Sequence, residues 1–325
     1  MKLWQKNQAP HEKIEHFTVG KDRIYDLHFV AYDCKASIAH AQMLGQIGVL
    51  TLEEADQLVA VLEELKSAAE KGDFIIEDKF EDMHSKIEYV LTEKLGVLGK
   101  KIHTARSRND QILAALHLYL KAEIKTLKGL THEFFKLLMN LAEQHKDKLL
   151  PGYTHFQVAT PSSFGLWFSA YAESLIDDVT LFNAAHEIVN QNPLGSAAGY
   201  GSSFPVDRKS TTYQLDFADL KYNVIAAQMS RGKAEKTSAN AMAGIAATLS
   251  KLAMDICLYM GQEHSFITFP EALTTGSSIM PHKKNPDVFE LIRGKCNLLQ
   301  GLPNQFGLLM TNLPSCLLYT SPSPR

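Results

Sequence analysis

Between Asn109 and Lys148, apolar side chains recur at the period of an α-helix. Spacings of three and four residues place them on one face, which predicts a helix with a single buried stripe. No proline interrupts this stretch, and Pro151-Gly152 follows as a stop signal. Such a helix would be roughly 60 Å long, so the chain must bury it among other long helices. The stripe consists of Ile112, Leu116, Leu120, Ile124, Leu127, Phe134, Leu138 and Leu141.

Further helices are predicted on both sides of this one. Thr160-Pro161 favours a helix start, because threonine caps well and proline fits the first helical position. We see no convincing strand alternation and no repeat. The predicted fold class is all-α, with an N-terminal helical domain over residues 1–105 and a helical bundle over 106–315; the boundary follows a change in helix length. The further helices span residues 32–47, 52–71, 161–189, 232–266 and 286–310, the last with a kink at Pro303.

Composition narrows the class of partners. The net charge is only -3 and 21% of the residues are charged, so no excess of Lys and Arg points to nucleic acid. The four cysteines form no CxxC pair, which favours reduced thiols in the cytosol. We find no signal-like N-terminus and no apolar run long enough for a bilayer, and we expect a cytoplasmic protein without membrane contact.

The most informative stretch is TGSSIMPHKKNP, residues 275–286. Gly276 and the two serines suit a loop with free backbone N–H groups, which leads into a helix N-terminus that favours anions. Lys283 and Lys284 add positive charge beside it. The stretch therefore predicts a clamp for a carboxylate; by composition alone, a solvated Ser/Lys loop would be the more ordinary interpretation.

Two further segments carry polar residues in an unusual order. TARSRNDQ, residues 104–111, stands at the start of the long helix, where Asn109 could simply be a cap. YTHFQ, residues 153–157, places a histidine before the next predicted helix, where a surface role is the ordinary alternative. Two weaker pieces are EDMH at 81–84 and the Gly/Ser loop at 192–203, which is equally well explained as a structural turn.

Together, in this order, the segments resemble the argininosuccinate lyases of the fumarase/aspartase superfamily, from about Ala9 to Ser315. The resemblance implies the superfamily's five-helix bundle, here without its last part and its C-terminal domain. It implies cleavage of argininosuccinate, a small dicarboxylate, to arginine and fumarate, with no cofactor and no metal. It also implies a homotetramer in which three subunits build each active site.

The resemblance assigns roles to single residues. Ser277 matches the catalytic base, His155 the acid side or its relay, and Glu290 the partner of that histidine. Lys283 and Asn285 match positions that bind the substrate carboxylate. A serine hydroxyl becomes a base only where positive charge and N–H dipoles hold its oxyanion, and the doubly charged intermediate needs the same support. The remaining substrate-binding set is Ser107, Arg108, Asn109, Thr154, Gln157, Asp82 and His84.

The chain departs from the family pattern near its start and at its end. Gln5 to Gln8 follow Trp4 where Gly-Gly-Arg-Phe is common, and Asp22 stands roughly where a substrate-contacting serine is usual. After Ser315 the resemblance stops in mid-motif, and residues 316–325 read as an unrelated tail. We expect this tail to be foreign sequence, and the chain as written to have little or no activity; robust fumarate release would contradict that expectation.

Two alternatives stay open from the sequence. One is another fumarate-releasing lyase of the superfamily, such as adenylosuccinate lyase or aspartase, against which residues 104–111 argue. The other is a non-catalytic protein on the same scaffold, as in the lens crystallins. The presence of Ser277, Lys283, His155 and Glu290 argues against this second alternative.

Overall fold

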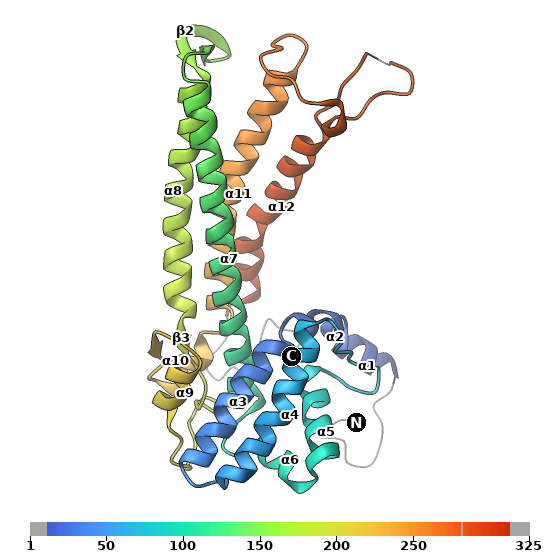
Figure 1. Ribbon diagram of the computed structural model, residues 1–325, viewed down its shortest axis with the longest axis vertical. Helices are drawn as coiled ribbons and strands as arrows, with labels where there is room; N and C mark the ends of the chain where they lie inside the picture. Colours follow the sequence, from blue (N-terminus) through green and yellow to red (C-terminus); the bar gives the residue numbers. More distant parts are fainter. Residues whose placement is uncertain (1–11, 281, 313–325) are drawn as a thin grey trace. The chain divides into compact units, whose positions relative to one another are not determined.

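The computed structural model describes residues 12–280 and 282–312 (Figure 1). Its elements are almost all helical, which confirms the all-α fold class. The described residues form two compact units, the first from residues 12–123, 187–235 and 309–312, the second from 124–186 and 236–308. The boundary expected near residue 105 stays a prediction about domains. The tail at 316–325 and the departure at Gln5 to Gln8 lie outside the described residues.

The first unit contains short helices and a two-residue parallel strand pair. Its core lies between α3, α4 and α5 and includes Met43, Leu62, Phe80 and Ile87. The predicted helices at 32–47 and 52–71 are confirmed. The elements are α1 (Glu12–Val19), α2 (Asp22–Tyr25), η1 (Asp26–His28), α3 (Val30–Gln46), α4 (Leu52–Glu70), α5 (Met83–Leu95), α6 (Val97–Lys101), the start of α7 (Arg108–Gln144), β3 (Gln191–Asn192), α9 (Arg208–Gln214), β4 (Asp219–Leu220) and α10 (Val224–Met229).

Local hydrogen bonds explain where two of these helices begin. Thr51 accepts a hydrogen bond from the backbone N–H of Glu54 at 3.1 Å, and the Glu54 carboxylate accepts one from the N–H of Thr51 at 3.1 Å. This reciprocal capping box satisfies two N–H groups that the first turn of α4 would leave open. Asp82 caps α5 with a one-way bond, since its carboxylate accepts from the N–H of Ser85 at 2.7 Å.

Gly99 is required by the close approach of α6 to the end of α5. A Cβ at this position would lie 2.3 Å from the carbonyl oxygen of Leu91 and 2.6 Å from the backbone nitrogen of Thr92. We expect Gly99→Ala to lower the free energy of unfolding by about 1–3 kcal/mol, because backbone must move. Gly129→Ala is the control: that helical position has nothing within 4 Å, so alanine should stabilise by about 0.5–1 kcal/mol. Equal urea midpoints for both variants would contradict the prediction.

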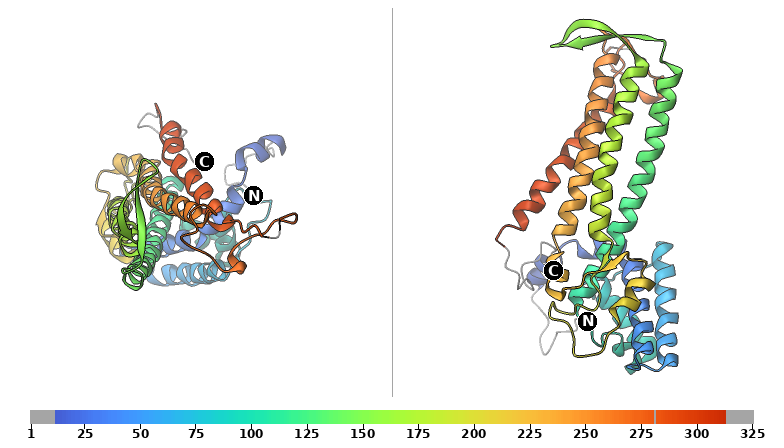
Figure 2. Two further views of the ribbon diagram at one scale, coloured as in Figure 1. Left: turned by 90° about the horizontal axis from the view of Figure 1, so that it is seen from above. Right: turned by 90° about the vertical axis from the view of Figure 1, so that its left-hand side faces the viewer.

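The second unit is a bundle of long helices. It contains the rest of α7, α8 (Phe164–Val189), α11 (Lys233–Met260), η2 (Glu271–Leu273) and α12 (Asp287–Leu309), with α7, α8 and α11 side by side in Figures 1 and 2. Leu138, Leu175 and Leu252 meet in its core. A half-buried polar contact joins α8 to α11, because Asp255 accepts hydrogen bonds from Trp167 Nε1 at 3.0 Å and from the Tyr171 hydroxyl at 2.6 Å.

A β-hairpin stands where the sequence predicted the start of a helix. Strands β1 (Leu149–Thr154) and β2 (Gln157–Ser163) pair antiparallel, with Pro151 opposite Pro161. The Thr160-Pro161 signal was therefore misread: a two-stranded ribbon has only edge strands, where proline is tolerated. Helix α8 begins three residues later than expected, at Phe164, and Ser163 caps it by accepting from the N–H of Leu166 at 3.1 Å.

Helices α12 and α11 lie where the sequence predicted them, but α11 differs from the prediction in its C-terminal end and in its apolar length. Helix α12 runs from Asp287 through Pro303 to Leu309. Helix α11 ends at Met260, six residues early, because the N–H of Phe266 turns back to the carbonyl of Tyr259 at 2.9 Å. By length and composition alone α11 could cross a membrane, so the expectation that no segment reaches that length was wrong. In the structure it packs against α7 and α8 as a bundle helix.

Candidate active site

The segment with His155 forms the tip of the β1–β2 hairpin. Thr154 pairs with Gln157, and the two residues between them, His155 and Phe156, have φ values of 52° and 59°. Two successive positive φ angles are the geometry of the two-residue turns that match the twist of a hairpin. Side chains other than glycine adopt it at a cost and often at functional positions. The turn leaves His155 exposed at the end of the second unit.

Aromatic contacts hold the base of this hairpin. The ring of Tyr153 lies 6.0 Å from that of His264 and 6.5 Å from that of Phe266, measured between centroids. Both partners belong to the connection that leads from α11 towards the loop at 275–285. The β1–β2 hairpin, which carries His155, is thus in contact with the segment before the loop at 275–285, which carries Ser277. Figure 1 shows the hairpin and this loop at the same end of the bundle.

The loop at 275–285 is closed at its base by a short antiparallel bridge. The N–H of Asn285 donates to the carbonyl of Thr275 at 2.8 Å, and the N–H of Thr275 donates back at 3.4 Å. The Asn285 amide also donates to the Thr275 hydroxyl at 3.3 Å, and that hydroxyl donates to the carboxylate of Asp287. The loop therefore begins and ends at one fixed point, the start of α12.

Within the loop, backbone N–H groups point at the hydroxyl of Ser277. Its Oγ accepts from the N–H of Met280 at 3.2 Å and from that of Ile279 at 3.3 Å, and the side chain is half-buried. Such donors stabilise negative charge on the oxygen they face. Such N–H groups would favour the deprotonated form of the Ser277 hydroxyl over the neutral form.

The two lysines of the loop differ in their surroundings. The Lys284 ammonium forms an ion pair with Glu271 at 3.2 Å. The exposed Lys283 ammonium makes no ion pair or hydrogen bond to another described residue, and its backbone N–H donates to Met280 at 3.0 Å. Lys283 is thus the available cation of this loop.

Glu290 lies in the first turn of α12 with an exposed side chain. Among the described residues of one chain, no hydrogen bond or ion pair joins it to His155. The proposed His155–Glu290 pair therefore stays a prediction.

In the first unit, Ser107 caps helix α7. Its hydroxyl accepts from the N–H of Asn109 at 3.0 Å, and the helix begins at Arg108. The idea that Asn109 is merely the helix cap was therefore wrong, because Ser107 fills that position. The side chains of Ser107, Arg108 and Asn109 are half-buried, so all three keep access to solvent at the helix start.

Two other predicted substrate-binding residues are paired with each other. Arg108 Nη1 lies 3.1 Å from Asp82 Oδ1, and Arg108 Nη2 lies 3.6 Å from Glu88 Oε1. Asp82 reaches this position because it caps α5. The structure thus brings the 81–84 segment against the 104–111 segment, although they are separate in sequence.

His84 is nearly inaccessible and faces a buried carboxylate. Its Nδ1 lies 3.2 Å from Asp33 Oδ1, and Gln111 Nε2 donates to both Asp33 oxygens at 3.0 Å. Burial raises the pKa of Asp33 to about 6, against the opposing influence of Arg106 and Gln111. Sequence reasoning missed Asp33; a lone acid inside the apolar pattern of α3 is the signal that could have found it.

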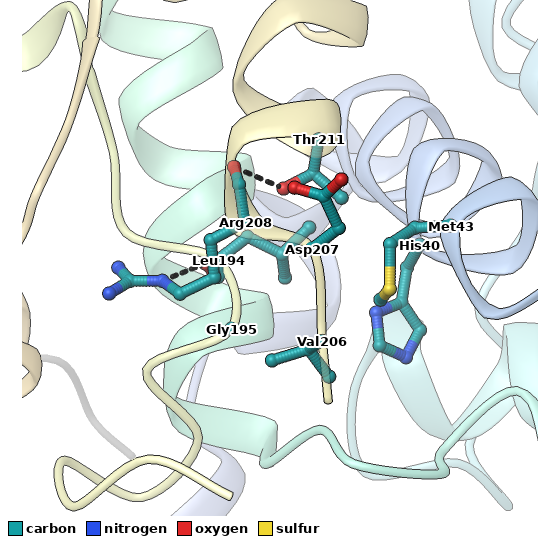
Figure 3. Close-up of a pocket in the computed structure, with 8 residues that line it drawn as sticks. All are labelled: His40, Met43, Leu194, Gly195, Val206, Asp207, Arg208 and Thr211. Atoms are coloured by element: carbon teal, nitrogen blue, oxygen red, sulfur yellow. Dashed lines mark hydrogen bonds between the residues drawn. The ribbon is translucent and has the colours of Figure 1, made fainter. Parts of the chain in front are cut away.

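The Gly/Ser loop at 192–203 is fixed by many internal hydrogen bonds. The fully buried Asn192 donates to Thr212 at 2.9 Å and accepts from Leu194 at 2.9 Å, and Arg208 donates to the carbonyl of Leu194 at 3.0 Å. The empty space of a small pocket beside it, shown in Figure 3, is about 150 Å³ including open solvent, whereas ligand sites usually need about 300 Å³ or more. These contacts favour the structural turn. The pocket lining is His40, Met43, Leu194, Gly195, Val206, Asp207, Arg208 and Thr211.

Over residues 12–280 and 282–312 there is no group of three or more His, Cys, Asp and Glu side chains that could hold a metal ion.

The chain that forms this long-helix bundle matches a known family. The family model described as Lyase matches residues 11–301, and the chain belongs to this lyase family. Argininosuccinate lyase of Parabacteroides distasonis is 58% identical over 97% of the chain, and that of Phocaeicola vulgatus is 54% identical over 97%. Within the family, the chain therefore belongs to the argininosuccinate lyases, which are carbon–nitrogen lyases.

The chain spans 70% of the length of both relatives. Among solved structures, a variant of EDDS lyase with bound fumarate has a TM-score of 0.83 and 24% sequence identity, covering 97% of this chain and 62% of its own. At this identity the likeness concerns the fold.

Proposed function

We propose that the protein cleaves argininosuccinate to L-arginine and fumarate by β-elimination, in arginine biosynthesis. The observation that carries the proposal is the pair of backbone N–H groups on Ser277 Oγ, at 3.2 and 3.3 Å, in a loop whose available cation is Lys283. The N–H groups and the ammonium favour the alkoxide over the neutral hydroxyl, which lowers the barrier to its use as a base.

In the proposed reaction, Ser277 removes a proton from the carbon next to a carboxylate of the succinyl half. The electron pair passes into that carboxylate, and Lys283 and Asn285 stabilise the doubly charged intermediate. The electrons then return, the carbon–nitrogen bond breaks and fumarate forms. The departing nitrogen of arginine takes a proton from His155, with Glu290 of the assembled site as its partner. Ser107, Asn109, Thr154 and Gln157 hydrogen-bond the succinyl half, and Arg108, Asp82 and His84 complete its surroundings.

We infer that the active form is a homotetramer with shared active sites. Helix α7 is continuous over 37 residues, which corresponds to about 55 Å. The 104–111 segment stands at the first turn of this helix and the β1–β2 hairpin with His155 follows its last turn, which supports an active site that receives them from different chains. Exposed leucines along α12, namely Leu291, Leu298, Leu299, Leu308 and Leu309, offer an apolar surface for such contacts.

The expected setting is the cytoplasm, with a small dicarboxylate as the ligand and neither nucleic acid nor membrane as a partner. No cofactor enters the proposed chemistry, because the charge development is met by side chains and backbone N–H groups.

The substrate proposal is tested by comparing candidate substrates. The protein, at the full length that its gene encodes, is offered argininosuccinate, adenylosuccinate, aspartate and malate at equal concentration. We expect fumarate, followed by its ultraviolet absorbance, to appear from argininosuccinate at a kcat/KM at least about 100-fold above the others, since each site polar group left unpaired by a wrong substrate costs binding. Preferential turnover of one of the others would reject the proposed substrate, and turnover of none would favour a non-catalytic protein.

A further inference from the structure

The carboxylate of Asp110 lies fully buried between two segments that are far apart in sequence. Its Oδ1 accepts a hydrogen bond from the N–H of Ser107 at 3.0 Å. Its Oδ2 accepts from the N–H of Gly195 at 2.9 Å and from that of Ala197 at 2.9 Å. The side chain has no exposed surface. One carboxylate therefore joins the start of α7 to the Gly/Ser loop.

The loop is shaped to receive this carboxylate. Gly195 has a φ of 84° and Ala197 a φ of 50°, and positive φ angles at alternate residues turn their N–H groups towards one point. The loop is in turn fixed from behind, because Gln228 donates to the hydroxyl of Ser196 at 2.9 Å and to the carbonyl of Ala197 at 3.1 Å. Asp110 thus fastens residue 107 to a rigid support.

We propose that Asp110 is a positioning residue for substrate binding: its carboxylate sets the position of Ser107, Arg108 and Asn109 through the Ser107 N–H and the Gly195 and Ala197 N–H groups. The inference rests on the proposed function, in which Ser107 and Asn109 bind the succinyl half. Under this proposal the Gly/Ser loop at 192–203 supports the substrate-binding residues and does not itself bind a ligand.

Asp110→Asn is the sharpest substitution, because it keeps the volume and removes one of two acceptor oxygens. The NH2 group of the asparagine must face either the N–H of Ser107 or those of Gly195 and Ala197, and it cannot accept a hydrogen bond from them. We expect the KM for argininosuccinate and the inhibition constant of succinate to rise by about 10- to 100-fold, because small displacements of binding groups cost that much, with a smaller change in kcat.

Asp207→Asn is a control for the loss of a carboxylate that accepts backbone N–H groups elsewhere in the same unit. Asp207 also accepts two backbone N–H groups, from Lys209 at 3.0 Å and Ser210 at 2.9 Å, but it caps α9. Asp207 is exposed and Asp110 is fully buried, and asparagine caps a helix about as well as aspartate, so Asp207→Asn should leave thermal stability and the inhibition constant of succinate near those of the unsubstituted protein. A merely structural loss in Asp110→Asn would lower thermal stability and leave the inhibition constant of succinate unchanged. Equal succinate constants in Asp110→Asn, Asp207→Asn and the unsubstituted protein would overturn the proposal.

Two further measurements keep the test decisive. If Asp110→Asn does not fold, Asp110→Glu keeps the charge but lengthens the side chain, and an unchanged succinate constant in that variant overturns the proposal. If the unsubstituted protein does not cleave argininosuccinate, the proposed function fails separately. Amide hydrogen exchange then decides the positioning role: faster exchange at residues 107, 195 and 197 in Asp110→Asn than in Asp207→Asn supports it, and equal exchange overturns it.

Discussion

Ser277→Ala is expected to reduce the turnover of argininosuccinate by about 10³- to 10⁴-fold, the contribution of a positioned base to proton transfer. Alanine removes the oxygen that receives the N–H groups of Ile279 and Met280, and no other hydroxyl takes its place without moving the loop. The protein should remain folded, because the hydrogen bonds of the Ser277 side chain to residues 12–280 and 282–312 are these local ones in a surface loop. Fumarate release and the thermal unfolding midpoint are measured on the protein at the full length that its gene encodes.

Ser278→Ala provides the matched control for this experiment. Ser278 is the next residue of the same loop and is exposed, so its loss should change turnover by no more than a few-fold. If Ser277→Ala kept normal turnover, Ser277 could not be the base. If both variants lost turnover equally, the loop conformation rather than the Ser277 hydroxyl would be responsible.

The second large effect is expected on stability in mild acid, at His40. This histidine is fully buried on α3, and its Nε2 donates to the carbonyl of Thr104 at 2.9 Å. Burial, with Arg106 adding to it, lowers the pKa of His40 to about 3 from its usual 6.5. The folded protein therefore holds the neutral ring, and stability is lost as the pH falls below 6.5 towards 3. At about pH 5 the loss relative to about pH 8 is about 2 kcal/mol from this residue.

His40→Gln tests the prediction, because a glutamine amide can donate to Thr104 but does not titrate. Urea unfolding at about pH 8 and pH 5 should show the variant losing about 2 kcal/mol less than the unsubstituted protein over this interval. The comparison between the two proteins is needed because Asp33 acts in the opposite direction. Its pKa is raised to about 6 in the folded protein, so the free energy of unfolding gains from this residue as the pH falls from about 6 to 3.8. An identical pH dependence of both proteins would contradict the buried neutral state of His40.

The helices of the bundle were predictable because their signals are local. Apolar spacing of three and four residues defined α7 to within a few residues, and the Pro-Asp sequence at 286–287 marked the start of α12. The β1–β2 hairpin escaped prediction for the opposite reason. A two-stranded ribbon pairs Leu149 with Ser163, and neither strand carries an alternating apolar pattern, so the proline at 161 was read as a helix start.

The candidate site was likewise predictable in part. The order of residues in 104–111, 153–157 and 275–286 was enough to predict the family and the residues to examine. It gave no indication that Ser107, and not Asn109, caps α7, or that Arg108 and Asp82 pair. Asp33 was missed because a single acid in an apolar helix has no recognisable motif until its partners, His84 and Gln111, are seen around it.

The sequence by itself thus determined the long helices, the family and the residue types of the chemistry, since each depends on neighbours within a few positions or on an ordered motif. Only the tertiary structure decided how the motifs are supported. Asp110 meets Gly195 and Ala197 across more than eighty residues of chain, and Asp33 accepts a hydrogen bond from Gln111, which lies 78 residues further along the chain. Such contacts follow from the packing of distant segments, because a buried carboxylate must find its donors wherever the fold places them.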